Sequence, residues 1–197
     1  MSWAPCITAF LSLAIAACAH APVTLVALPS APRAAADQDG GQGPGTTILL
    51  RPVVIPGYLE SYPVVVGRDG NTLIVAKDAE WAEPLSDAVG RVLRDALSQR
   101  LGASRVLIAG DGRIPDADLS VEFLALDPQQ GKLRLDARWG FSCTARDRPS
   151  QGGRTFLEVP LEAATPPAVA AGTADALGRL ADTLANQAAC GNGDLAR

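Results

Sequence analysis

The chain has 197 residues, which is the length of one ordinary domain, and its 48% hydrophobic content supports a core and argues against disorder. The net charge is −4 and the pI is about 5.0. With no cluster of Lys and Arg, the sequence lacks the basic surface of a nucleic-acid binder. It also lacks the polybasic face with which proteins dock on anionic lipid.

Residues 1–17 have the features of a signal peptide. The segment from Ile7 to Ala17 is uncharged and apolar. It is too short for a helix that spans a bilayer, which needs about 20 apolar residues. An export signal has such a run followed by small residues, so we expect this segment to be removed on export.

The end of this segment, Ile15-Ala16-Ala17-Cys18, resembles the lipobox of bacterial lipoproteins. The resemblance implies that Cys18 receives a diacylglycerol and becomes the first residue of the mature protein. Residues 18–197 would then form a single periplasmic domain that the lipid tethers to a membrane. The anchor would be firm because each methylene of the acyl chains buried in the membrane contributes about 0.8 kcal/mol. The residue after the cysteine is Ala19 and not Asp, which by the pattern of enterobacterial lipoproteins implies the outer membrane. The alternative is an ordinary signal peptide that is cut elsewhere, for example after Ala21, with Cys18 discarded.

Two further cysteines, Cys143 and Cys190, remain in the exported part of the chain. In an oxidising compartment an even pair favours a disulfide. The alternative is two buried thiols that pack as small hydrophobic side chains. No His or other Cys stands near either residue, so a metal site is not expected.

Eight apolar or alternating segments, separated by clusters of turn residues, are candidates for strands, and we expect about six or seven strands from them. Residues 29–45 are rich in Ala, Pro, Gly, Gln and Asp, which predicts a flexible loop. Residues 67–71 and 127–131 carry turn signals and predict hairpins. The strand patterns lie at 23–28, 47–55, 64–66, 73–75, 106–109, 119–125, 133–143 and 155–161.

The two long strands in the second half of the chain show the clearest alternation. Leu119, Val121, Phe123 and Ala125 are expected on one face, and Trp139 is expected in the core with its apolar neighbours. A sheet with one apolar face and one polar face is typical of antiparallel pairing with one face covered.

Two amphipathic helices are predicted, at residues 83–101 and from Pro166 to Gly191. Pro84 and Pro166 suit the first helical position, and Gly102 suits the end of the first helix. Each helix has one apolar stripe: Leu85, Val89, Val92, Leu93, Ala96 and Leu97 in the first, and Val169, Ala176, Leu177, Leu180, Leu184 and Ala188 in the second. The predicted fold is therefore α+β, a two-layer α/β sandwich with both helices on one face of a mostly antiparallel or mixed sheet.

Residues 47–107 resemble the ABC-type transport auxiliary lipoproteins, the PqiC-like family. The motifs that carry the resemblance are Ile55-Pro56, Tyr58-Leu59, Trp81-Ala82-Glu83-Pro84-Leu85, the spaced Arg91, Leu93 and Leu97, and Leu101-Gly102. Thr24 to Pro29 matches the short first strand of such proteins. The chain departs from the pattern at Glu80, where an Arg is usual, and at Glu60-Ser61-Tyr62-Pro63.

This resemblance implies a non-enzymatic auxiliary subunit of an MCE-type lipid transport system. Its partners would be a periplasmic MCE-domain protein and the permease and ATPase of an ABC transporter. The auxiliary lipoprotein would sit in the outer membrane, face the periplasm and dock on the tunnel that carries lipids or other hydrophobic molecules. Rings of several copies would fit this role. The covalent lipid on Cys18 is the only non-protein group expected.

Four residues are candidates for partner binding: Tyr58, Tyr62, Trp81 and Glu83. Trp and Tyr are enriched at the energetic centres of interfaces. The alternative for Trp81 is a core side chain packed at the helix entry. Tyr58 and Tyr62 share this ambiguity.

Two other functions compete with transport. The first is an independent lipoprotein that binds a small hydrophobic ligand between sheet and helices. The second is a lipid-anchored hydrolase, which the sequence disfavours because its single His, His20, stands beside the lipid anchor. Asp116 and Asp118 are expected to be solvated residues at the entry of a strand.

Overall fold

The computed structural model describes residues 22–32, 46–144 and 150–188. Within these ranges the chain forms eight strands, two α-helices and one short 3-10 helix, η1. In chain order they are β1 (Thr24–Val26), β2 (Ile48–Leu50), η1 (Gly57–Leu59), β3 (Pro63–Asp69), β4 (Thr72–Trp81), α1 (Leu85–Leu101), β5 (Val106–Leu107), β6 (Ala117–Gln129), β7 (Lys132–Cys143), β8 (Gln151–Pro160) and α2 (Pro166–Gln187).

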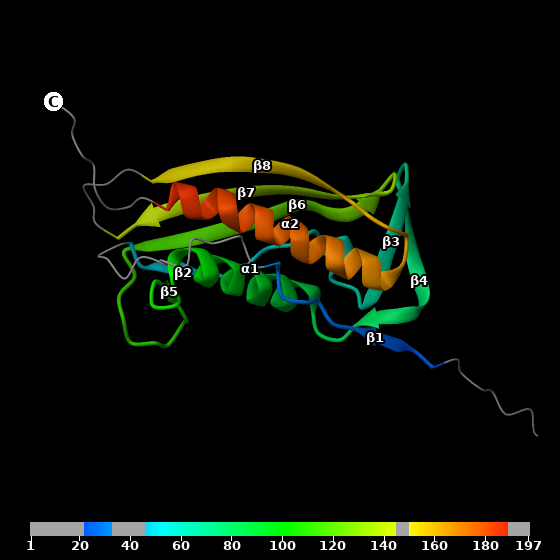
Figure 1. Cartoon of the computed structure of the whole chain (residues 1–197), viewed down its shortest axis with the longest axis horizontal. Helices are drawn as coiled ribbons and strands as arrows, with labels where there is room; N and C mark the ends of the chain where they lie inside the picture. The colour runs from blue at the N-terminus through cyan, green and yellow to red at the C-terminus, as the bar shows by residue number, and fades with distance from the viewer. Residues whose placement is uncertain (1–21, 33–45, 145–149, 189–197) are drawn as a thin grey trace, which may run out of the picture.

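The strands form two mixed sheets. The larger sheet has the order β5-β2-β6-β7-β8, with β2 parallel to both of its neighbours and β6, β7 and β8 antiparallel. The smaller sheet has the order β1-β4-β3 and stands across one end of the long strands (Figure 1). The predicted α+β class is confirmed, but the expected single sheet is divided because β4 pairs only with β1 and β3 among the described strands.

Both helices lie on the same side of the larger sheet, as Figure 1 shows. The apolar stripes predicted for them are buried, and side chains such as Leu93, Leu97 and Leu180 have no exposed surface. The exception is Ala188, which follows the end of α2 and is only partly buried. They meet Leu119, Phe123, Leu133 and Phe141 from the sheet in one core. Because the helices cover one face only, the opposite face of β6–β8 is the outer face of this sheet.

One arginine joins the two helices. Nε of Arg100 on α1 donates to Asp182 on α2 at 2.5 Å, and its NH1 donates to the Ala96 carbonyl at 2.9 Å. The start of α1 differs slightly from the prediction: Pro84 is the residue before the first helical turn and not its first member.

A β-bulge in β6 changes which side chains face the core. The pairing with β7 shifts between Phe123 and Ala125, so that Leu124 is an extra residue in β6. Before the bulge, Leu119 and Phe123 point toward the helices; beyond it, Ala125 pairs with Asp136 and shares the outer face. The prediction that Ala125 lies on the same face as Phe123 is therefore wrong, since an inserted residue reverses a period of two.

The turn between β6 and β7 is tighter than predicted. Gln129 pairs with Lys132, so only Gln130 and Gly131 form the turn, with φ of 51° and 74°. Positive φ at both central positions is the geometry of a type I′ hairpin, which matches the twist of the flanking strands. Asp127, expected in this turn, belongs to β6 and pairs with Arg134.

One residue near the start of the predicted flexible loop, Ala31, packs against the folded body. Leu28 and Ala31 are buried, and the Ala31 methyl group lies close to Gly178 of α2. Ala31 packs because its small side chain fits against a helix glycine that has no Cβ, whereas Pro29, Ser30 and Pro32 are exposed. The rest of the predicted loop, 33–45, lies outside the described residues.

Candidate functional site

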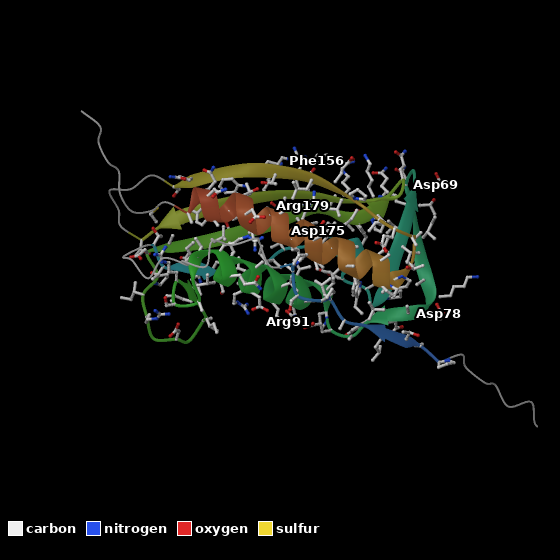
Figure 2. The ribbon with its side chains drawn as sticks, in the orientation of Figure 1. Asp69, Asp78, Arg91, Phe156, Asp175 and Arg179 are labelled. Atoms are coloured by element: carbon white, nitrogen blue, oxygen red, sulfur yellow. The ribbon has the colours of Figure 1, made fainter. Side chains whose placement is uncertain are left out.

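The four partner-binding candidates differ in exposure. Tyr62 is 54% exposed and follows η1, whereas Tyr58 within η1 is half-buried. Glu83 lies between β4 and α1, where it accepts a hydrogen bond from Arg91 at 2.5 Å. The same Arg91, labelled in Figure 2, also donates to the Leu28 carbonyl at 3.3 Å and so ties this corner to the N-terminal segment.

Trp81 is buried, with 5% of its surface exposed, and packs in the core cluster. Its backbone N–H donates to the Tyr62 carbonyl at 2.8 Å, which holds the end of β4 against the loop after η1. Of its two interpretations, the core position at the helix entry is therefore the one that fits. The side chain presents little surface to a partner, and Tyr62 beside it is the exposed aromatic residue.

Tyr58 belongs to a buried polar cluster that the sequence did not reveal. Its hydroxyl donates to Oδ1 of Asp127 at 2.6 Å, and Nε of Arg68 donates to Oδ2 at 2.7 Å. Asp127 is only 3% exposed, and the Arg68 guanidinium also lies over the Tyr58 ring at 4.9 Å. Both carboxylate oxygens of Asp127 thus accept a hydrogen bond, as a buried charge requires.

This environment changes the acidity of two of its members. Burial, followed by the hydrogen bond to Asp127, raises the pKa of Tyr58 to about 12. The hydrogen bond to Asp127 is also the main reason why the pKa of Arg68 is raised. Tyr58 therefore remains a neutral hydrogen-bond donor across the physiological pH range.

A cavity of about 290 Å³ lies at this cluster on the outer face of the sheet. Apart from Leu124 and Ala125, its walls are polar or charged. They comprise Tyr58, Arg68, Asp127, Gln129 and Arg134.

The neighbouring side chains of the outer face form cross-strand ion pairs. Arg154 on β8 donates to both oxygens of Asp136 on β7, at 2.7 and 2.6 Å, and Lys132 donates to Glu158 at 2.7 Å. The hydrogen bonds from Arg154 hold the pKa of Asp136 below its usual value.

A second hollow of about 500 Å³ lies between α1 and the strands β2 and β5. Glu83 is part of its wall, together with Arg51, Asp87, Arg91 and Arg94. Both hollows thus carry several charges, whereas fully buried leucines fill the layer between the larger sheet and the helices.

Three of the predicted site residues are cysteines. Cys143, at the end of β7, is disulfide-bonded. Cys18 and Cys190 lie outside the described residues. The lipidation of Cys18 and the pairing of Cys143 with Cys190 therefore stay predictions.

Within the described ranges, no group of three or more His, Cys, Asp or Glu side chains is placed to hold a metal ion. In the same ranges, no helix combines the length and the apolar character that crossing a membrane requires. Asp118, predicted as a solvated strand-entry residue, lies in β6 and accepts a hydrogen bond from Arg51 at 2.8 Å.

The fold is thus an α+β domain whose helices cover one face of the larger sheet and leave a charged outer face. The sequence matches the family described as ABC-type transport auxiliary lipoprotein component over residues 27–185, which take in β2 and nearly all of α2. The chain belongs to this family. The predicted family is confirmed, and no curated protein matches the sequence.

Two solved structures share the fold. One is the crystal structure of an uncharacterized protein, with a TM-score of 0.67 at 16% identity over 86% of this chain and 100% of that chain. The other is protein XCC0632 from Xanthomonas campestris, assigned to DUF330, with a TM-score of 0.60 at 16% identity over 85% and 94% of the two chains.

Proposed function

We propose that this chain is a non-enzymatic auxiliary subunit of an MCE-type transport system, anchored in the outer membrane by lipid on Cys18. The observation that carries the proposal is the family match, which covers almost the whole folded body. The lipobox-like Ile15-Ala16-Ala17-Cys18 supports the anchor, and Ala19 supports the outer membrane. The subunit works by docking on the periplasmic MCE protein that carries hydrophobic molecules between the membranes.

The docking surface includes Tyr62. This side chain is 54% exposed, and the backbone hydrogen bond between its carbonyl and Trp81 fixes its position at the end of β4. An exposed aromatic side chain on a rigid backbone loses little entropy when a partner covers it. Tyr62 also stands where the chain departs from the family pattern, so it would adapt the surface to this chain's own partner.

Site-specific photo-crosslinking in living cells tests this proposal. A benzoylphenylalanine at position 62 is expected to capture an MCE-domain protein, which mass spectrometry of the adduct identifies. The matched control is the same amino acid at Ile114, which is 81% exposed in a loop between β5 and β6. We expect no such adduct there.

Two results would contradict the proposal. Crosslinks from Tyr62 that never contain a transport subunit would exclude this docking surface. Failure to recover any MCE protein, permease or ATPase with the wild-type lipoprotein from crosslinked envelopes would exclude the transport role itself.

A further inference from the structure

Arg134 on β7 has an incomplete set of partners. Its Nε is buried and has no hydrogen-bond partner among the described residues. Its guanidinium lies over the ring of Phe156 at 5.0 Å, but a ring face does not accept the in-plane N–H bonds of that group. A buried, unpaired donor is costly and calls for an acceptor.

The carboxylates around Arg134 are already bound to other cations. Asp127, opposite it on β6, binds Arg68, and Asp136, two residues further along β7, binds Arg154. Glu158, opposite it on β8, pairs with Lys132. Each carboxylate of this group therefore has a cation of its own, and Arg134 is the positive charge in excess.

The excess charge faces a cavity. Arg134, Arg68 and Gln129 line the hollow of about 290 Å³, where Asp127 is the only carboxylate of the lining. The lining carries two guanidinium groups and one carboxylate, so it has one net positive charge. Both oxygens of the carboxylate, Asp127, already accept hydrogen bonds. The volume is at the small end for ligand pockets, which favours an ion or a polar head group over an acyl chain.

We infer that this cavity binds a phosphate group, with Arg134 as its principal ligand and Arg68 and Gln129 as further donors. Guanidinium groups bind phosphate through paired, charge-assisted hydrogen bonds. These donors come from three strands, β7, β3 and β6, and the oxygens of a tetrahedral anion can accept from all of them, whereas a planar carboxylate has only two oxygens. The phosphate comes either as the free ion or as part of a lipid head group. This inference does not depend on the transport role.

Thermal unfolding of the full lipidated chain in a neutral detergent tests the site. Inorganic phosphate is titrated at constant ionic strength, with sodium chloride making up the difference, since a ligand that binds only the folded state raises the midpoint in a saturable way. We expect saturation for the wild type and binding at least about tenfold weaker for Arg134→Gln.

The control is Lys132→Gln. It removes the same charge from the same strand two residues away, but Lys132 is half exposed and already paired with Glu158. We expect its phosphate affinity to stay within about threefold of the wild type. Arg134→Lys keeps the charge without the planar fork and should fall between the wild type and Arg134→Gln.

A second titration identifies the source of the phosphate. Glycerophosphoglycerol is a lipid head group without acyl chains; tighter binding than inorganic phosphate would assign the site to lipid, and weaker binding would assign it to the free ion. The inference is overturned if neither compound gives a saturable shift. It is equally overturned if Lys132→Gln weakens binding as much as Arg134→Gln, because that result means general charge screening.

Discussion

At the scale of single residues, Tyr58 and Asp127 show how a buried charge is accommodated. Removing a carboxylate from water costs several kcal/mol unless donors replace the lost hydration. Tyr58 and Arg68 supply those donors from η1 and β3 and bond to Asp127 on β6. The three side chains thus link the smaller sheet to the larger one.

Tyr58→Phe is expected to lower the free energy of unfolding by about 1–2 kcal/mol, since it leaves one oxygen of the buried Asp127 without a donor. Urea denaturation at neutral pH measures this loss. The control is Tyr62→Phe, which removes an exposed hydroxyl and should change the stability by less than about 0.5 kcal/mol.

The raised pKa of Tyr58, about 12, also predicts a dependence on alkaline pH. Between the ordinary tyrosine pKa of about 10 and this value, the folded protein holds a proton that the unfolded chain releases. The contribution is therefore complete below pH 10 and is lost as the pH rises toward 12. Tyr58→Phe should lack this part of the alkaline loss, and an identical profile in both proteins would refute the assignment.

The lowered pKa of Asp136 predicts that the protein loses stability at acidic pH. This pKa is lowered chiefly by the hydrogen bonds from Arg154, so the contribution of Asp136 to stability is present above the ordinary carboxyl pKa and is lost as the pH falls through the lower native value. Asp136→Asn should therefore be less stable than the wild type at pH 7, with a difference that shrinks in acid. Glu158→Gln, which affects a more exposed pair, is the control and should have a smaller effect at pH 7.

At the scale of elements, the bulge in β6 determines the chemistry of the outer face. Without Leu124 as an extra residue, Asp127 would share the face of Phe123 and point into the core. With it, Asp127 and Gln129 lie beside Arg134, and the cavity acquires its charged lining. The alternation of apolar residues locates the strand correctly. It does not reveal the one-residue shift in pairing, because Phe123, Leu124 and Ala125 around the bulge are all apolar.

The helix α2 provides a test of the core at this scale. Leu180 is fully buried on its apolar stripe, whereas Arg179 is exposed and pairs with Asp175 one turn earlier (Figure 2). Leu180→Ala should lower the free energy of unfolding by about 2–5 kcal/mol, and Arg179→Ala by less than about 0.5 kcal/mol. Urea denaturation compares the two, and similar losses would show that the stripe is not the core face.

At the scale of the whole molecule, the pairing of β1 with β4 determines where the N-terminal end of the folded domain lies. β1 pairs in parallel with the end of β4, and both lie at the end of the molecule where the smaller sheet stands (Figure 1). β4 leads into α1, which runs from there toward the other end of the molecule. Val23, at 50% exposed, and Leu25 lie on the β1 segment, only five and seven residues after Cys18. Lipid on that cysteine would therefore hold this end of the body close to the membrane.

Cys18→Ala tests the anchor. The variant is expected to leave the membrane fraction and to lack the mass of the attached lipid, which cell fractionation and intact-mass analysis measure. Cys6→Ala, inside the predicted signal peptide, is the matched control and should remain membrane-bound with the mature mass unchanged. A Cys18→Ala protein that stays in the membrane with the mass of a lipidated chain would exclude this cysteine as the site.

The sequence by itself determined the α+β class, the family and nearly all of the buried stripes of both helices. These features depend on short-range periodicity and on local motifs such as Trp81-Ala82-Glu83-Pro84-Leu85, which each segment carries independently of the others. Only the tertiary structure decided that the strands form two sheets, that Trp81 is buried while Tyr62 is exposed, and that Arg134 faces a cavity beside Arg68. The physical reason is that Tyr58, Arg68 and Asp127 are separated by up to 69 residues. Their contact depends on how the smaller sheet packs on the larger one and on one bulge, neither of which is a local property of the chain.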